Sequence, residues 1–306
     1  MSNPATSANP SQGSASDDSG EASNPGSTRA LVLGGGGVAG IAWELGVLRG
    51  VTDVYPNLFG ELITADRIIG TSAGAVVAVQ ITSGVGLDAL YAAQLVPSNS
   101  EIEVDFDPEE QRAQLAAATA GATSTEHAGQ RLGAFALTTQ RVDEGVRRAA
   151  VAARLPVLTW PRAPTMLTAV DAHTGELHVF TWQSGVELVD AVAASCAVPG
   201  VWPAVTIGDR RYIDGAARST TNADLAAGCD RVLIIAPSSD DPAPHWEADE
   251  EFDALPEAEV LIVRPDPPSA TAFGANPLSQ TTRAPSARAG RAQGRTHAHE
   301  IAALWR

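Results

Sequence analysis

Residues 69–75, which read IGTSAGA, place one serine between two glycines directly after an apolar run. Gly70, Ser72 and Gly74 fit the pattern G-x-S-x-G, with DRII before it as a predicted strand and AGAVVAVQ after it as a predicted helix. This is the context of the sharp strand-to-helix turn that exposes a nucleophilic serine. A side chain at either glycine position would collide with the neighbouring elements. We therefore predict that Ser72 is a nucleophile.

A second glycine-rich stretch, LVLGGGGVAG at residues 31–40, also follows an apolar run and precedes a predicted helix at residues 40–51. Backbone N–H groups at such a helix start can stabilise any negative oxygen, including a transient oxyanion. The run from Gly35 to Gly40 also fits G-x-G-x-x-G, the dinucleotide-binding fingerprint, although the acid further on, Glu61, does not end a clear second strand. By itself, this stretch leaves a dinucleotide and another anion as open alternatives.

A serine nucleophile needs a base, and the six histidines are the usual candidates. His297 and His299 are late enough in the chain for this role, but both fall on a predicted helix. Asp214, in YIDGA, instead stands at the carboxyl end of a predicted strand, where open α/β sheets place their sites. A carboxylate that contacts Ser72 Oγ can accept its proton directly. Because the ordinary pKa of Asp is about 3.9, burial of the Asp214 carboxyl would make it a stronger base.

The composition excludes several classes of function. All 20 basic residues are arginine, and the absence of lysine excludes a Walker-type phosphate loop and a lysine Schiff base. The net charge of −16 disfavours nucleic acid as a partner and tight binding to anionic lipid by charge alone. Cys196 and Cys229 form no disulfide framework or metal-ligand pattern, so we expect both in the buried core.

Short apolar runs alternate with helical patterns along the chain. This alternation predicts an α/β fold with a mostly parallel central sheet and helices on both faces. The all-apolar runs at residues 231–237 and 258–265 are typical of central parallel strands. The predicted strands are residues 29–34, 66–70, 165–171, 177–182, 210–216, 231–237 and 258–265.

Three segments differ in composition from the rest of the predicted catalytic domain, residues 29–265. Residues 1–28 are rich in Ser, Asn, Gly and Pro and predict a disordered tail. Residues 87–155 are rich in alanine and predict a helical insertion that could act as a lid. Residues 266–306 predict a loop and a helix packed on the domain. Their arginines, within residues 283–306, could pair with the acids of residues 240–259.

The sequence shows no apolar signal segment before the first predicted strand. The one uncharged window of membrane-spanning length, residues 68–87, is interrupted by glycines and polar residues, which favours a buried strand, turn and helix. We therefore expect a cytoplasmic protein with at most peripheral, transient membrane contact.

Three motifs in this order resemble the patatin-like phospholipase family: a glycine-rich loop after the first strand, a G-x-S-x-G turn and a D-G-A motif. Here they are Gly34–Gly37 with Gly40, Gly70–Gly74, and Asp214–Ala216. The resemblance covers about residues 29–236, and it includes AVDAHTGE (169–176), AASCAVPGVWPAV (193–205) and DGAARSTTNADLAAGCDRVLII (214–235).

The resemblance implies a patatin-like three-layer sandwich and a Ser–Asp dyad, with Ser72 as nucleophile and Asp214 as base. Gly35, Gly36 and Gly37 would donate their N–H groups to the oxyanion. The substrate would be a lipid ester, and hydrolysis would release a fatty acid without a metal or an organic cofactor. The glycines that support the motifs would be Gly40, Gly70, Gly74 and Gly215.

The chain departs from the family pattern at one place. The family's glycine loop commonly carries Arg or Lys just before its last glycine, whereas this chain has Val38-Ala39 before Gly40. The missing charge favours neutral esters or another acyl lipid over anionic phospholipids, and it keeps open a lipid-binding or regulatory protein with negligible turnover. Trp202 is either a core residue or a contact for an acyl chain, and Trp43 is expected in the core.

Overall fold

The structure is a computed structural model that describes residue 1 and residues 27–98, 102–103, 107–139, 142–238 and 254–306. The predicted tail, residues 1–28, lies almost entirely outside the described residues. The described strands form one sheet, in which hydrogen bonds join neighbours in the order β5-β6-β3-β2-β1-β7-β8, with β4 also paired to β3. The strands are β1 (Arg29–Leu33), β2 (Arg67–Thr71), β3 (Thr165–Asp171), β4 (Leu177–Phe180), β5 (Val205–Ile207), β6 (Arg210–Asp214), β7 (Arg231–Ile235) and β8 (Glu259–Val263).

The sheet is mixed, with a parallel part and an antiparallel part. Strands β3, β2, β1, β7 and β8 pair in parallel, whereas β4, β5 and β6 pair antiparallel to their neighbours. The mostly parallel sheet is as predicted. The prediction that residues 258–265 form a central strand is wrong for the sheet of described strands, in which β8 pairs with β7 alone and ends the strand order. Most of its side chains are only half-buried.

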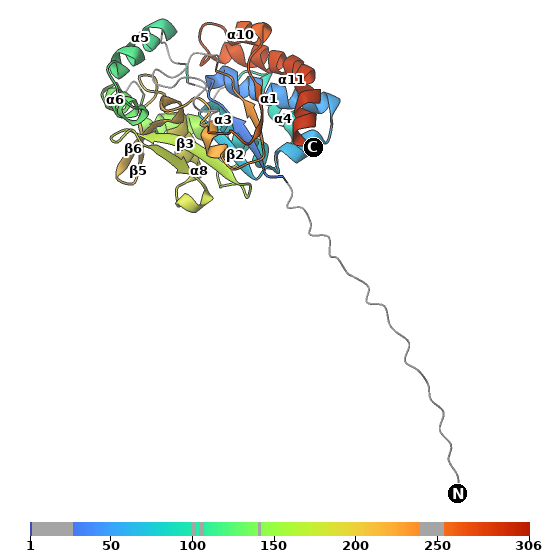
Figure 1. Ribbon diagram of the computed structural model, residues 1–306. Helices are drawn as coiled ribbons and strands as arrows, with labels where there is room; N and C mark the ends of the chain where they lie inside the picture. Colours follow the sequence, from blue (N-terminus) through green and yellow to red (C-terminus); the bar gives the residue numbers. More distant parts are fainter. Residues whose placement is uncertain (2–26, 99–101, 104–106, 140–141, 239–253) are drawn as a thin grey trace.

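Helices cover both faces of the sheet, which confirms the α/β prediction (Figure 1). Side chains alternate along β1, so Leu31 and Leu33 pack with the core under α1 and α3, while Ala30 and Val32 pack on the opposite face. On that second face α6 packs against Val170 of β3. The helices are α1 (Gly37–Val54), α2 (Leu58–Leu62), α3 (Ala73–Thr82), α4 (Leu87–Gln94), α5 (Pro108–Thr119), α6 (Thr125–Thr138), α7 (Glu144–Ala152), α8 (Leu188–Ser195), α10 (Pro267–Phe273) and α11 (Arg283–Trp305).

The C-terminal helix α11 packs along α1 at unusually short range (Figure 1). Glycines on both helices make the approach possible: a Cβ added at Gly50 would lie 2.2 Å from the Arg291 carbonyl oxygen, and one at Gly294 would lie 2.1 Å from the Val47 carbonyl oxygen. Trp43 is fully buried in this contact, as predicted, and its indole N–H donates to Gln293 Oε1.

Two arginines of α11 have partners outside the acidic block with which the sequence predicted pairing. Arg291 and Arg295 both bond Asp53 of α1 instead, at 2.8 Å and 2.6 Å. Residues 239–253 of the acidic block lie outside the described residues. These ion pairs therefore fasten α11 to α1.

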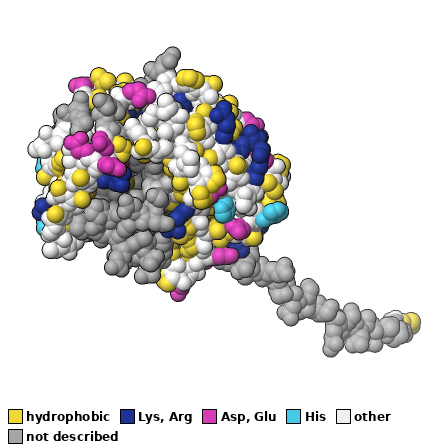
Figure 2. Space-filling view, turned by 90° about the horizontal axis from the view of Figure 1, so that it is seen from above, with side chains coloured by type: hydrophobic (Ala, Val, Ile, Leu, Met, Phe, Trp, Pro, Cys, Tyr) yellow, Lys and Arg dark blue, Asp and Glu magenta, His cyan; other side chains and the backbone are white. Residues whose placement is uncertain are grey.

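The predicted helical insertion, residues 87–155, contains α4 to α7 and no strand among its described residues. Within the described ranges, no helix is both long enough and apolar enough to cross a membrane. On the face seen in Figure 2, acidic, basic and apolar side chains are interspersed.

Candidate active site

Ser72 occupies the turn between β2 and α3 in a strained backbone conformation. Its φ is 54° and its ψ is −112°, and Asn222 is the only other described non-glycine residue with positive φ. A Cβ at Gly70 would lie 2.6 Å from the Gly74 carbonyl oxygen, and one at Gly74 would lie 2.0 Å from the Leu33 carbonyl oxygen. The predicted strand-to-helix turn is therefore present, and both flanking glycines are required by close packing.

Asp214 reaches Ser72 because two strands meet end to end along β3. Thr168 of β3 pairs with both β2 and β4, and Ala169 pairs with both β4 and β6, so β2 and β6 share the edge opposite β4. Thr71, the last residue of β2, lies opposite Thr168, and Asp214, the last of β6, lies opposite Ala169. Asp214 thus lies at the carboxyl end of a strand, as predicted, and this strand is antiparallel to β3 and runs toward β2.

The two side chains are in hydrogen-bond contact. Ser72 Oγ donates to Asp214 Oδ2 at 2.8 Å, and the Ala216 N–H donates to Oδ1 at 2.8 Å. Both residues are buried, with exposed fractions of 7% for Ser72 and 2% for Asp214. Burial raises the pKa of Asp214 to about 7, although the two hydrogen bonds and the positive charge of Arg147 each lower it. The carboxyl is thus a much stronger base than an exposed aspartate.

The glycine-rich loop lies beside Ser72, but its three candidate donors differ. The Gly35 N–H donates to the Thr220 carbonyl at 2.8 Å and is therefore already occupied in this structure. No described residue accepts a hydrogen bond from the N–H of Gly36 or Gly37. Gly37, with a φ of 64°, begins α1 and lines the cavity beside Ser72. The candidate oxyanion donors are therefore Gly36 and Gly37 rather than Gly35.

The other motif glycines support the same loops. A Cβ at Gly40 would lie 3.3 Å from Ala73 Cβ, and one at Gly215 would lie 2.3 Å from Thr168 Oγ1. Gly40 thus allows α1 to approach the start of α3, and Gly215 allows the turn after Asp214 to approach β3.

Two residues at the end of α8 hold the Ser72 backbone, a role that the sequence did not reveal. The Ser72 N–H donates to Ser195 Oγ at 2.9 Å, and Cys196 Sγ donates to the Ser72 carbonyl at 3.2 Å. Burial raises the pKa of the Cys196 thiol to about 12, so the thiol stays protonated as a donor. The buried position of Cys196 was predicted, but its contact with Ser72 was not.

Asn222 connects the ends of β2 and β6. Its side-chain amide lies 2.8 Å from the Ser219 carbonyl oxygen and 3.0 Å from Thr71 Oγ1, and Thr71 in turn bonds Thr168 Oγ1 at 2.8 Å. These residues are buried, so their hydrogen bonds fix the loop after Asp214 relative to the strand that carries Ser72. The sequence signal available was the residue type alone, an asparagine, which tolerates left-handed backbone, within a Ser/Thr-rich stretch.

The family model for patatin-like phospholipase matches residues 31–227, which is well over half of the chain. The chain belongs to this family. Family membership indicates a lipid ester hydrolase. The structure is also similar to two solved structures, although both similarities are distant.

The first is VipD from Legionella pneumophila, with 10% identity and a TM-score of 0.43, covering 90% of this chain and 67% of VipD. The second is the type III effector protein ExoU, with 14% identity and a TM-score of 0.37, covering 90% of this chain. The chain spans about half of ExoU, 53% of its length. No curated protein sequence matches this chain.

In this patatin-like protein the space beside Ser72 is small. A cavity of about 20 Å³, room for roughly one water molecule, adjoins Ser72. Trp202 lines it and is also buried, and the Arg147 guanidinium stacks 3.7 Å from its ring centre. Leu278 covers the side next to Gly37.

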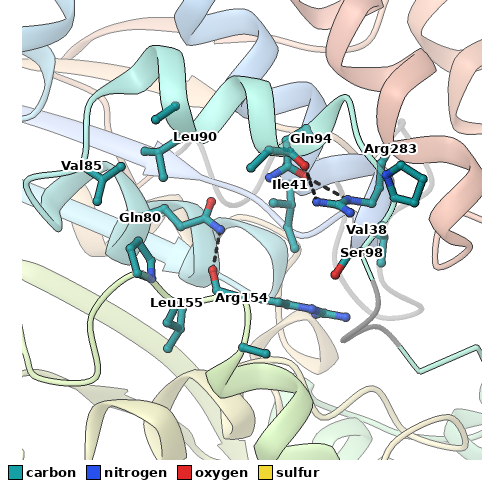
Figure 3. A pocket seen from close by; sticks show the side chains of 15 residues that line it. Val38, Ile41, Gln80, Val85, Leu90, Gln94, Ser98, Arg154, Leu155 and Arg283 are labelled. Atoms are coloured by element: carbon teal, nitrogen blue, oxygen red, sulfur yellow. Dashed lines mark hydrogen bonds between the residues drawn. The ribbon is translucent and has the colours of Figure 1, made fainter.

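A larger cavity of about 390 Å³ shares part of its wall with this small one. The residues that line both are Val38, Ile41 and Arg154. Figure 3 shows Val85, Leu90 and Leu155 at the far end of the larger cavity from Val38. This volume is within the range of small-molecule sites, which is roughly 300–1,000 Å³.

The alternative site residues lie elsewhere. His299 bonds the Tyr55 hydroxyl and His297 bonds Glu300, both on or beside α11. Glu61 lies on α2 before β2 begins, at the opposite end of the parallel strands from the glycine loop, and it pairs with Arg306. Among the described residues, no three His, Cys, Asp or Glu side chains are grouped as a metal site would need.

Proposed function

We propose that this protein is a serine acyl hydrolase that cleaves lipid esters, with Ser72 as nucleophile and Asp214 as general base. The observation that carries the proposal is the 2.8 Å hydrogen bond between Ser72 Oγ and Asp214 Oδ2. It is supported by the strained backbone of Ser72, which such turns use to present the hydroxyl, and by membership of the patatin-like phospholipase family.

In the acylation step, Ser72 Oγ attacks the ester carbonyl carbon while Asp214 Oδ2 accepts the hydroxyl proton. The carbonyl oxygen becomes an oxyanion, for which Gly36 and Gly37 are the candidate donors. One such donor contributes about 3 kcal/mol to the stability of the transition state. When the tetrahedral intermediate collapses, the carbon–oxygen bond to the leaving alcohol breaks, and Asp214 returns the proton to that oxygen.

In the deacylation step, a water molecule takes the place of the alcohol. Asp214 accepts a proton from this water as its oxygen attacks the acyl-serine carbonyl. The intermediate then releases the fatty acid, and Asp214 returns the proton to Ser72 Oγ. Because its pKa is raised to about 7, Asp214 can act in turn as base and as acid near neutral pH.

Substrate entry requires the cover of the Ser72 cavity to move, since about 20 Å³ cannot hold an ester. The cover includes Arg147 of α7 and Leu278, so α7, within the helical insertion of residues 87–155, would act as part of a lid. The closed cavity also favours a second candidate function, a lipid-binding protein with negligible turnover. A dinucleotide-binding protein is disfavoured by the position of Glu61.

Hydrolysis of a panel of p-nitrophenyl esters and intact phospholipids tests the proposal. Wild-type protein should hydrolyse at least one member, and Ser72→Ala should lower its kcat at least about 10³-fold. Ser83→Ala, a serine at the end of α3 whose hydroxyl bonds the Gln80 carbonyl, is the matched control and should retain full activity. Equal activity in Ser72→Ala would overturn the proposal, and lipid binding without hydrolysis would favour the lipid-binding function.

A further inference from the structure

The glycine loop of this protein lacks the cation that its family commonly carries, and the structure places two other cations beside Ser72. Val38, which stands near the usual position of that cation, contributes an apolar side chain to both cavities. Arg147 and Arg154, from α7 and the turn after it, line the same Ser72 cavity. The charge missing from one side of the cavity is thus present on another.

The spacing of the two arginines explains their common direction. They are seven residues apart, so they lie on one side of α7 and its continuation. Arg148, by contrast, points away and pairs with Glu187 and Asp190. Both cavity arginines are close enough to lower the pKa of the Cys196 thiol, which also lines the cavity.

Arg147 is held in place as a buried cation. Its exposed fraction is 3%, and its guanidinium stacks on Trp202 at 3.7 Å from the ring centre. Such a stack favours a fixed guanidinium plane. The positive charge also lowers the pKa of Asp214, opposing the effect of burial. While α7 covers the cavity, Arg147 is therefore a positive charge close to the Ser72–Asp214 pair.

Arg154 lies where the two cavities adjoin. It lines both of them, together with Val38 and Ile41. Its backbone carbonyl accepts a hydrogen bond from Gln80 Nε2 at 2.9 Å, which fixes the turn after α7. Figure 3 shows its side chain extending across the larger cavity toward the end at which Val38 and Ser98 lie. A substrate that occupies both cavities would therefore lie close to Arg154, which lines each of them.

The larger cavity has a second arginine, whose role is different. Arg283 bonds Gln94 Oε1 and the carbonyls of Ala93 and Val96, so it caps the end of α4. The rest of the wall is mostly apolar, as Val85, Leu90, Leu155 and their neighbours show. The cavity thus offers an apolar space with Arg154 at its boundary with Ser72.

We propose that Arg154, with Arg147 beside Ser72, is a specificity-determining residue that selects acyl esters carrying a phosphate over neutral esters of the same chain length. This inference rests on the proposed hydrolase function and reverses the preference expected from the glycine loop alone. A guanidinium suits this role, because its planar fork of N–H groups matches phosphate oxygens. The apolar part of such a substrate would occupy the larger cavity.

The test uses two soluble substrates with the same acyl chain, octanoyl glycerol 3-phosphate and octanoyl glycerol. Wild-type protein should show a higher kcat/KM for the phosphate ester. Arg154→Gln should lower the ratio of the two kcat/KM values about 10- to 100-fold, as the loss of a charged hydrogen bond does. Most of this change should be a higher KM for the phosphate ester, and Arg154→Lys should recover part of the ratio.

Arg148→Gln is the matched control, because this neighbouring arginine faces Glu187 and Asp190 instead of the cavity. It should leave the ratio within about twofold of wild type. The proposal is overturned if wild-type protein does not prefer the phosphate ester, or if Arg154→Gln lowers kcat/KM equally for both substrates.

A binding measurement separates this inference from the proposed hydrolysis. The probes are the ether analogues of the two substrates, which have no ester to cleave, and the readout is Kd by calorimetry. Tighter binding of the phosphate ether, lost in Arg154→Gln and kept in Arg148→Gln, supports the inference even if no ester is hydrolysed. Equal binding of the two ethers contradicts it, whether or not the protein is an esterase.

Discussion

The two sides of the Ser72 cavity are built differently. On the side of the sheet, Asp214, Ser195 and Asn222 hold the nucleophile and its neighbours through hydrogen bonds between buried atoms. On the opposite side, Arg147 and Leu278 reach over the cavity from α7 and from the segment before α11. The first side determines the geometry of the reacting groups, and we expect it to tolerate little change. The second side determines how substrate reaches Ser72 and which charge it meets there, and we expect substitutions on this side to change activity only moderately.

The largest effect should follow from Asp214→Asn, which keeps the shape of the side chain but removes the base. We expect kcat/KM to fall about 10²- to 10⁴-fold, the usual contribution of a general base. Asp190→Asn, which alters a surface partner of Arg148, is the control and should keep its activity. If Asp214→Asn retained full esterase activity, Asp214 would not be the base and a histidine would have to be sought.

The pH dependence of wild-type activity should report the same carboxyl. Because Asp214 must be ionised to accept a proton and its pKa is about 7, kcat/KM should rise about tenfold per pH unit below that value and level off above it. The pH dependence of kcat/KM is measured from initial rates on one neutral ester between pH 5 and pH 9. A plateau that extended down to pH 5 would contradict a buried base.

Stability should depend on pH in the opposite direction to activity. The folded pKa of Asp214, about 7, lies above the unfolded value of about 3.9, so the folded state binds this proton more tightly. The resulting stabilisation is complete below about pH 4 and is lost as the pH rises through 7. Asp214→Asn lacks this dependence. The free energy of unfolding of wild type, measured by urea denaturation, should therefore decrease relative to that of Asp214→Asn as the pH rises from 5 to 8.

A smaller effect is expected at Asn222, which holds the sheet side without touching the reacting atoms. Glycine accepts its left-handed backbone, so Asn222→Gly removes the side-chain hydrogen bonds with little added strain. We expect a loss of about 1–3 kcal/mol in the free energy of unfolding and a lower kcat. Asn57→Gly is the control, because Asn57 is exposed and makes no capping hydrogen bond. Equal losses in the two variants would refute the role of Asn222.

The smallest effect is expected at Leu278, on the side that covers the cavity. Leu278→Ala removes about 0.5–1 kcal/mol of apolar contact from the closed state, which should make opening about two- to fivefold more frequent. The rate of reaction with a bulky active-site probe should rise by that factor, while kcat for a small ester stays the same. A slower reaction would mean that Leu278 binds the substrate and does not cover the site.

The same two sides differ in how well the sequence predicted them. The turn around Ser72 and the placement of Asp214 near a strand end followed from local patterns, because a nucleophile turn requires its glycines. The direction of β6 did not follow, since a five-residue segment such as RRYID does not reveal whether its strand is parallel or antiparallel. The edge position of β8 was missed for a similar reason, because an apolar run looks the same in a central and in an edge strand.

The covering side was not predictable from local patterns. Arg147 and Arg154 belong to an alanine-rich segment without a motif, and their approach to Ser72 depends on how α7 packs against α8. The occupied N–H of Gly35 was also hidden, because its partner, the Thr220 carbonyl, is far away in the sequence. Long-range packing, rather than residue type, determines these features.

The central claim is that Ser72 is a nucleophile activated by Asp214, and labelling with an alkyl fluorophosphonate tests it most directly. Peptide mass spectrometry of the folded wild-type protein should locate the label on Ser72, with no label in Ser72→Ala and a much slower reaction in Asp214→Asn. A label on another residue, or equal labelling of wild type and Ser72→Ala, would contradict the claim.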